Sequence, residues 1–280
     1  MTKFLGPAPL LIGALLLASC SQRGGNSGNA PSVSNIIRVK ADLSLKPALL
    51  ELAAQYQQEN SSHLLLQFAS GSDLQPNRLG DSVDVYILAN DGSRGSQADS
   101  AADSARKVIL AYAVPCIVVP HMNPALVSDL KDLTKPGLRI GIVDPQKDVL
   151  GAFAMEILRR NGIYDVVQPR LVMIDSSALE LADCVARQEV DAAIGWTVCS
   201  NWVQGSIDVT LLNAADIPRI AAVTAWRATA PVDSAKANRL MNYLTTERSL
   251  EIFRKWGYLT LTSDLEMYAP IADIGGTPAR

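Results

Sequence analysis

The feature that most constrains the fold is an alternation of short apolar runs with helical patterns, which begins at Ile36. The runs IIRVKA and HLLLQFA have the length and composition of strands, and the segment between them places apolar side chains on one face of a helix. The second half of the chain repeats the pattern, from LRIGIVD through GAFAMEILRRNG to VDAAIGW. This rhythm predicts an α/β fold in which mainly parallel sheets are flanked by helices.

Two long apolar segments interrupt this pattern. The first, VILAYAVPCIVVP, reads as one long strand or as two strands joined at Pro115, and the second, IAAVTAWRA, would return the chain to its first half. A globule of about 245 residues with such connections favours two lobes with a ligand cleft between them. The predicted lobes are residues 36–114 with 221–280 (lobe I) and residues 115–220 (lobe II).

The N-terminus reads as a targeting segment. Residues 1–19 contain one lysine and an apolar run that is too short to span a bilayer, which predicts a secretory signal peptide. The small residues before Cys20 resemble a bacterial lipobox, which implies cleavage there and a lipid on the Cys20 sulfur; the alternative is an ordinary signal peptide with a chance cysteine. Residues 20–35 would then form a lipidated, flexible tether, and this lipid would be the only membrane attachment.

Charge and motifs exclude several classes of function. With 25 Lys and Arg against 28 Asp and Glu, the net charge of -3 predicts no cationic surface for nucleic acid. The chain has two histidines and lacks the GxSxG, HExxH and P-loop motifs, so we predict neither an enzyme nor a cofactor. The cysteines lack the spacing of a metal cation site. Cys184 and Cys199 could form a disulfide, and the alternative is three buried thiols including Cys116.

Several predicted strands end in a short loop of small or hydroxyl residues, after which a helix begins. These loops contain Ser44, Ser70 to Ser72, residues 145–150, and Ser176 with Ser177. Each loop could aim hydroxyl groups and unpaired helix-start N–H groups at one point beyond the strand ends, where open α/β sheets bind ligands. Neutral donors of this kind suit a fully ionised tetrahedral dianion. The alternative role for each serine is a helix N-cap.

The order of several segments is similar to that of a known family. FASGSDL resembles the loop FASSSTLA, SVDVYILAND resembles the strand PADLFISAD, and RQEVDAAIGW resembles the strand GEVDAGIVY. The segments VILAYAVPCIVVPHMNP, LRIGIVDPQKDVLGAFAMEILRRNGIYD and YLTTERSLEIFRKWGYL have counterparts in the same order. Over nearly all of Ile36–Leu259, the chain thus resembles the periplasmic molybdate-binding proteins of ABC importers. The resemblance implies the two-lobed type II periplasmic-binding-protein fold.

The resemblance also implies which residues would hold an oxyanion. The implied positions are Ser44; Gly71, with Ser70 and Ser72 beside it; the backbone of Leu150; Ala178, with Ser177 beside it; and Trp196. Trp196 stands where the family has a tyrosine, and its indole N–H could still donate. Three carboxylates near the loops, Asp42, Asp73 and Asp148, would repel a dianion. Either they point away as helix caps, which is the preferred interpretation, or the ligand carries a proton or a cation.

These features predict a lipid-anchored, extracytoplasmic substrate-binding protein in the periplasm or at the surface of a bacterial cell. As a monomer, it would close its lobes on molybdate or tungstate and deliver the oxyanion to an ABC permease and its ATPase. One alternative is a receptor for sulfate, phosphate or a small organic acid. Another is an envelope protein that keeps the fold for sensing or for assembly with a partner, and an enzyme ranks third.

Overall fold

The computed structural model describes residues 35–70, 74, 82–89, 107–174 and 176–275. The predicted signal peptide and Cys20 lie outside these residues, as do Gly71, Ser72 and Asp73. Among the described residues, no helix combines the length and the apolar character needed to cross a membrane.

The first of two sheets has six strands, which come from both the N-terminal and the C-terminal parts of the chain. The strands lie in the order β11 (Asp273–Ile274), β10 (Arg219–Arg227), β3 (Val85–Leu88), β1 (Ile36–Asp42) and β2 (His63–Ala69), and β4 (Lys107–Ala113) also pairs with β10. β1 is parallel to β2 and β3, whereas β3 and β4 are antiparallel to β10. The helices of this body are α1 (Lys46–Glu59), α7 (Ser234–Leu244), α8 (Glu247–Lys255) and the short 3₁₀ helix η2 (Leu43–Leu45).

The second sheet has five strands. They lie in the order β7 (Leu171–Ile174), β6 (Ile140–Val143), β8 (Ala192–Trp196), β5 (Pro115–Pro120) and β9 (Ile207–Leu211). β6 is parallel to β7 and β8, and β5 is antiparallel to β8 and β9. The accompanying helices are α3 (Val149–Arg160), α4 (Tyr164–Val167), α5 (Ala178–Ala186) and α6 (Cys199–Trp202), with the 3₁₀ helices η4 (Leu130–Thr134) and η5 (Gln168–Arg170).

Two connections join the bodies that these sheets form. β4 ends at Ala113 and β5 begins at Pro115, so VILAYAVPCIVVP is two strands that belong to different sheets. The return connection runs through the 3₁₀ helix η6 (Ala214–Asp216) into β10, which pairs antiparallel with β4. These connecting strands make both sheets mixed, whereas the βα units on either side keep their parallel pairing. The predicted α/β architecture of sheets flanked by helices is therefore confirmed.

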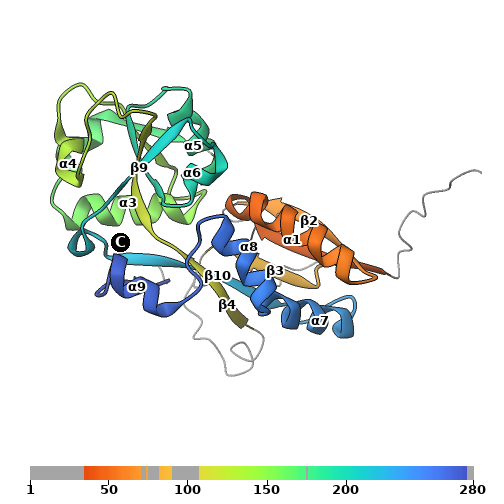
Figure 1. Cartoon of the computed structure of the whole chain (residues 1–280). Coiled ribbons are helices and arrows are strands. Elements are labelled where there is room, and N and C mark those ends of the chain that lie inside the picture. Colours follow the sequence, from red (N-terminus) through yellow and green to blue (C-terminus); the bar gives the residue numbers. More distant parts are fainter. Residues whose placement is uncertain (1–34, 71–73, 75–81, 90–106, 175, 276–280) are drawn as a thin grey trace, which may run out of the picture.

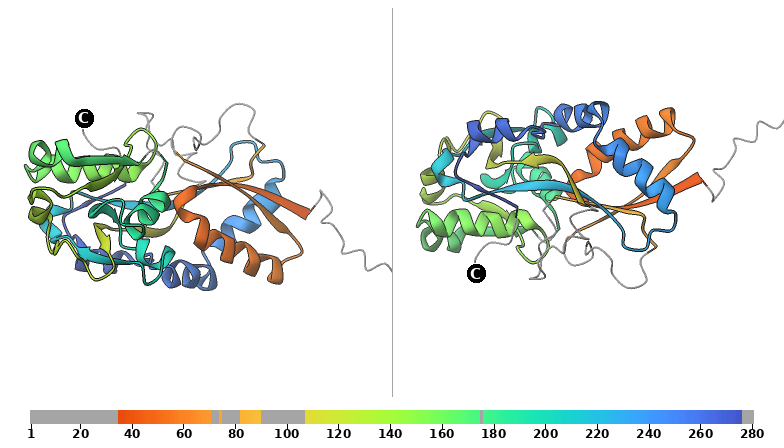
Figure 2. Two further views of the ribbon diagram at one scale, coloured as in Figure 1. Left: turned by 90° about the horizontal axis from the view of Figure 1, so that it is seen from above. Right: turned by 90° about the horizontal axis from the view of Figure 1, so that it is seen from below.

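The three views agree on how the two bodies are arranged. Figure 1 shows α3 to α6 around one sheet and α1, α7 and α8 beside the other, with β4 and β10 running between them. The views from above and below in Figure 2 show the same two bodies end to end along the molecule. The helix α9 (Thr262–Tyr268) lies beside the connecting strands (Figure 1). We use lobe I for the body with the six-stranded sheet and lobe II for the body with the five-stranded sheet.

The two lobes share part of their hydrophobic core. One continuous cluster of buried side chains includes Leu45 and Tyr258 from lobe I and Phe153 and Trp196 from lobe II. The helix α5 of lobe II contacts η2 of lobe I, so elements that follow the strand ends of the two lobes lie against each other. Burial of apolar surface between the lobes stabilises this arrangement by about 25 cal/mol for each Å² removed from water.

The start of α3 packs unusually close to the loop that precedes it. The helix begins at Val149 rather than at Gly151, where the sequence pattern placed it. A Cβ atom on Gly151 would lie 2.2 Å from the Val143 carbonyl oxygen and 2.7 Å from the Pro145 nitrogen. Because these neighbours are backbone atoms, they cannot move aside cheaply, and only glycine fits at this position.

We therefore expect Gly151→Ala to lower the free energy of unfolding by about 2 kcal/mol or more, because the added methyl group must push the backbone of the loop away. Urea denaturation followed by circular dichroism measures this change. Ala152→Ser, one residue further along the same helix at a half-buried position, is the matched control and should change stability by less than about 1 kcal/mol. Equal stability of the Gly151→Ala variant and the native chain would contradict the close approach.

Candidate functional site

The strand ends of lobe I bring the first two predicted loops together. β1 and β2 are parallel, and their register pairs Asp42 with Ala69 at the carboxyl ends of both strands. Ser44 follows in η2 and is 3% exposed, and half-buried Ser70 directly follows β2. Carboxyl ends of neighbouring parallel strands meet at one edge of a sheet, so these loops lie beside each other. Gly71 and Ser72, the other predicted members of the second loop, are outside the described residues.

Lobe II brings the third and fourth loops together in the same way. The register of β6 and β7 pairs Val143 with Ile174, and the Asp144 N–H donates to the Ile174 carbonyl oxygen over 2.9 Å. Leu150 and Ala178 lie in the first turns of α3 and α5, where backbone N–H groups lack a partner within their own helix. Both residues are fully buried. Two helix N-termini therefore converge at this edge of the second sheet.

The serine of the fourth loop is a helix cap. Ser177 is the N-cap of α5, where its Oγ accepts a hydrogen bond from the Glu180 N–H over 3.4 Å. The hydroxyl of Ser176 lies 3.3 Å from the same oxygen. The alternative role that the sequence left open for each serine thus applies to Ser177, which is 1% exposed.

The remaining predicted residue, Trp196, is the last residue of β8 in lobe II. Its ring packs edge-to-face against Phe153 of α3, with ring centroids 5.7 Å apart, and it is 2% exposed. From lobe I, the Tyr258 hydroxyl donates to the Ser44 carbonyl oxygen over 3.4 Å. Ser44 in η2 and Ala178 in α5 belong to two elements that contact each other where lobe I meets lobe II.

Two carboxylates accept hydrogen bonds from the donor groups of these loops. The sequence did not reveal these hydrogen bonds. The Asp42 Oδ1 atom accepts from the Ser44 N–H over 2.9 Å and from the Ser44 hydroxyl over 2.7 Å. The Asp148 Oδ1 atom accepts from the Leu150 N–H over 2.9 Å, and its Oδ2 atom accepts from the Ala178 N–H over 3.1 Å. Both residues cap helices, in agreement with the preferred interpretation, but their side chains point into the loops instead of away from them.

Burial and these carboxylates also raise the pKa values of two neighbouring groups. Burial raises the pKa of Tyr258 well above its usual value, and the negative charge of Asp42 raises it further. Burial raises the pKa of Cys199 to about 12, and the charge of Asp148 contributes in the same direction. Both groups therefore stay protonated and neutral at physiological pH.

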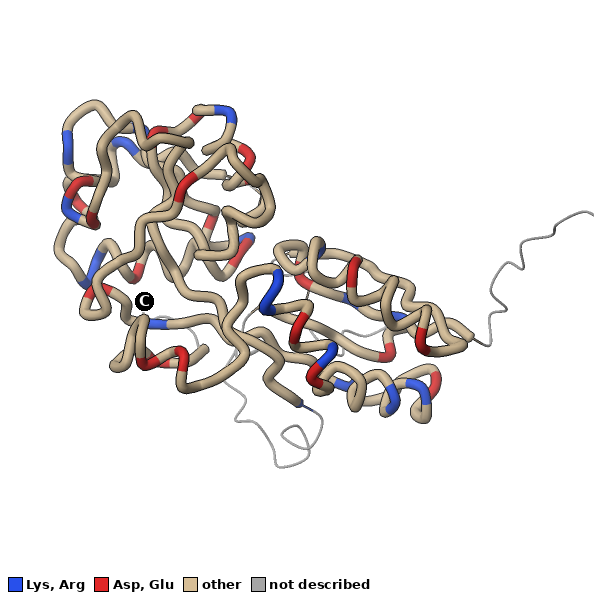
Figure 3. The backbone as a smooth tube through the Cα atoms, viewed as in Figure 1, with Lys and Arg blue, Asp and Glu red and all other residues tan. Residues whose placement is uncertain are grey.

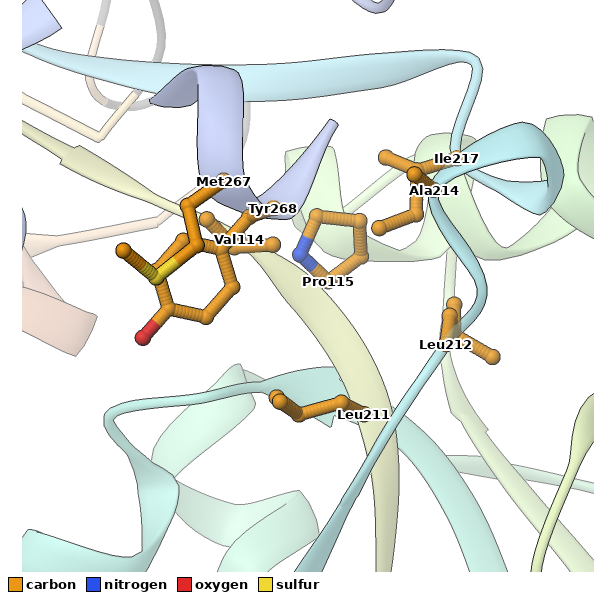
Figure 4. A pocket seen from close by; sticks show the side chains of 8 residues that line it. All are labelled: Val114, Pro115, Leu211, Leu212, Ala214, Ile217, Met267 and Tyr268. Atoms are coloured by element: carbon orange, nitrogen blue, oxygen red, sulfur yellow. The ribbon is translucent and has the colours of Figure 1, made fainter. Parts of the chain in front are cut away.

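Two other features of the described part of the chain differ from these loops. Among the described residues, no group of three or more His, Cys, Asp or Glu side chains is arranged to hold a metal ion. Figure 4 shows a pocket beside the connecting strands that is lined mostly by apolar side chains. It is lined by Val114, Pro115, Leu211, Leu212, Ala214, Ile217, Met267 and Tyr268. Figure 3 shows acidic and basic residues interspersed along the described backbone of both lobes. In this view no large region of that backbone carries charges of only one sign.

A family model for bacterial extracellular solute-binding proteins matches residues 37–259. The chain belongs to this family. Proteins of this family are non-enzymatic solute-binding proteins that act outside the cytoplasm.

Individual relatives and solved structures agree with this family. The chain is 27% identical to the molybdate-binding protein ModA of Rhodobacter capsulatus over 177 residues, which cover 62% of this chain and 68% of the relative. It is 24% identical to the ModA protein of Escherichia coli (strain K12) over 245 residues, which cover 83% and 92% of the two chains. The structure of the periplasmic molybdate-binding protein of Azotobacter vinelandii matches with a TM-score of 0.67 and 18% identity, over 81% of this chain and all of the other. The fold class predicted for this solute-binding protein is thereby confirmed.

The described cysteines are free and buried, so the disulfide that the sequence left open is absent from the structure. Burial raises the pKa of Cys116 well above its usual value, of Cys199 to about 12 and of Cys184 to about 11. A thiol with a raised pKa is protonated at pH 8, and the protonated form is a poor nucleophile.

We therefore expect iodoacetamide at pH 8 to leave Cys116, Cys184 and Cys199 unmodified in the native soluble chain and to modify all three in urea. Mass spectrometry of tryptic peptides measures the modified fraction at each thiol. The urea sample is the control for intrinsic reactivity. Rapid modification of Cys199 without urea would contradict its burial between the lobes.

Proposed function

We propose that this protein is the substrate-binding component of an ABC importer and that it captures a tetrahedral oxyanion, molybdate or tungstate, between its lobes. The lobe boundaries that go with this proposal are residues 36–114 with 221–280 and residues 115–220. The delivery partners would be a membrane permease and its ATPase, and the protein would work as a monomer. The family membership, and relatives whose names state molybdate binding, support the importer role and the ligand.

The observation that supports the proposal is that each lobe places neutral donors just beyond its strand ends, in elements of which η2 and α5 contact each other. In lobe I these are the N–H and hydroxyl groups of Ser44, and in lobe II they are the N–H groups of Leu150 and Ala178. Helix-start N–H groups carry partial positive charge and suit anions without any Lys or Arg. Ser70, Gly71 and Ser72 would add donors from the second loop, Ser177 would stand beside Ala178, and Trp196 would contribute its indole N–H. Contacts from both lobes to one ligand would favour a hinge motion that closes the cleft.

A second candidate ligand is an oxyanion that carries a proton, such as hydrogen phosphate. The observation that favours it is the presence of the Asp42 and Asp148 carboxylates at the predicted donors. A protonated oxyanion could donate its hydrogen to a carboxylate, whereas a fully ionised dianion would be repelled by it. Comparing phosphate with sulfate separates these cases, because sulfate carries no proton at neutral pH.

Isothermal titration of the soluble chain from Ser21 with molybdate, tungstate, sulfate and phosphate tests the function. We expect binding of molybdate and tungstate, and we expect Ser44→Ala to weaken it by about 10-fold to 100-fold, because a buried hydrogen bond to a charged ligand is lost. Ser62→Ala is the matched control, since Ser62 is also buried but precedes β2 at the opposite end of that strand. Unchanged affinity in Ser44→Ala would remove Ser44 from the site, and folded protein that binds none of the four anions would overturn the function.

We also propose that a lipid on Cys20 anchors the mature protein, with residues 21–35 as its tether. Full-length protein with Cys20→Ser should move from the membrane fraction to the soluble fraction of expressing cells, because the thioether to the lipid cannot form. The distribution between fractions is measured by immunoblot, with Cys184→Ser as the control for a cysteine inside the globule. Membrane association that is unchanged in Cys20→Ser would contradict lipidation at this residue.

A further inference from the structure

We propose that Asp42 and Asp148 are internal occupants of the oxyanion site and that they set its affinity and selectivity. Their carboxylates accept hydrogen bonds from the same N–H and hydroxyl groups that are proposed to bind the oxyanion. A dianion therefore competes with two side chains of the protein itself. This inference rests on the oxyanion-binding function proposed above.

Asp148 gives the stronger evidence, because its carboxylate joins two helices. The hydrogen bond from the Leu150 N–H to Oδ1 caps its own helix α3 and is an ordinary N-cap interaction. The hydrogen bond from the Ala178 N–H to Oδ2 comes from the first residue of α5, 30 positions further along the chain. Capping of α3 does not explain this second bond. The carboxylate lies where two helix N-termini converge, which is the position that suits an anion.

An ordinary cap in the same lobe differs in this respect. Asp129 caps the 3₁₀ helix η4, and its Oδ1 atom accepts from the Asp132 N–H of the same turn over 3.0 Å. Asp129 is half-buried, whereas Asp148 is 4% exposed. The carboxylate of Asp148 is thus both more enclosed and shared between elements, as expected for a group that fills a binding position.

Asp42 repeats the arrangement in the other lobe. Its Oδ1 atom accepts from both donors of Ser44, the N–H and the hydroxyl, and the side chain is 8% exposed. Ser44 is the residue of lobe I that the sequence resemblance assigns to the oxyanion. Each lobe therefore places one aspartate on the donors assigned to the ligand, although the two loops are unrelated in sequence.

A buried aspartate with two N–H partners also occurs where no ligand is expected. Asp84 accepts from the Arg38 N–H over 2.8 Å and from the Asp233 N–H over 3.0 Å. It directly precedes β3 and lies at the amino end of that strand, away from the loops at the carboxyl ends. Asp84 is therefore the matched comparison: its removal should cost stability without improving anion binding, whereas removal of Asp148 should do both.

The chemistry predicts what replacement of these carboxylates does. A carboxylate accepts at both oxygens, whereas the asparagine amide accepts at one atom and donates at the other. Asp148→Asn therefore leaves the Leu150 or Ala178 N–H without an acceptor, and it also removes a negative charge that repels the ligand. Asp148→Ser is a second form of the test, since serine can still cap α3 but its shorter side chain carries no carboxylate.

The experiment is isothermal titration of molybdate, tungstate, sulfate and phosphate into the soluble chain from Ser21 and its variants. We expect Asp42→Asn and Asp148→Asn each to bind the dianions at least about 10-fold more tightly than the native chain, and the double variant at least about 100-fold. Asp129→Asn and Asp84→Asn are the controls and should leave affinity within about 3-fold. Without anion, Asp148→Asn should melt at a lower temperature than the native chain, and added molybdate should reverse this difference.

Three outcomes would overturn the inference. If the native chain binds molybdate as tightly as the double variant, the carboxylates are caps alone, and the oxyanion-binding function stands. If binding of phosphate is lost in the variants, the carboxylates accept a proton from the ligand, and the second candidate ligand replaces the first. If the native chain, the Asn variants and the Ser variants all fold, as judged by circular dichroism, and bind none of the anions, the inference and the proposed function fail together.

Discussion

Buried N–H groups in the first turn of a helix must find an acceptor, and the loops at the strand ends of lobe II depend on that requirement. The N–H groups of Leu150 and Ala178 have no partner within their own helices, and both residues are fully buried. Leaving such a donor unpaired costs about 1 to 3 kcal/mol, so each of these N–H groups needs an acceptor within the protein. Asp148 meets this requirement for both helices with one side chain.

The connecting strands determine where these loops meet. β4 and β10 pair antiparallel in lobe I and lead directly into the strands and turns of lobe II. In this arrangement η2 contacts α5, and Trp196 packs against Phe153 within lobe II. Loops that are more than 100 residues apart in the sequence, around Ser44 and Ser177, become neighbours through this arrangement. The shared hydrophobic cluster then keeps water away from the hydrogen bonds at the contact.

Much of the fold could be predicted because it follows from local patterns. The parallel units β1–α1–β2 and β6–α3–β7 each appear in the sequence as an apolar run, a helical face and a second run, and Pro115 marks the change from one sheet to the other. The antiparallel position of β5 between β8 and β9 has no such signature, because it depends on pairing across more than 70 residues. The same limit applies to the site. An aspartate before a helix predicts a cap, but the second partner of Asp148, the Ala178 N–H, belongs to another helix and is visible only in three dimensions.

The prolines at the connections between the lobes have a mechanical consequence. Pro115 begins β5 on the outward connection, and Pro218 directly precedes β10 on the return connection. Each ring fixes its own φ angle and keeps the preceding residue, Val114 or Ile217, out of helical backbone conformations. Both connections are therefore torsionally stiff, and rotation of one lobe against the other must be concentrated in a few backbone angles. The closure proposed above would accordingly follow a restricted path, in which the loops separate and meet again in the same alignment.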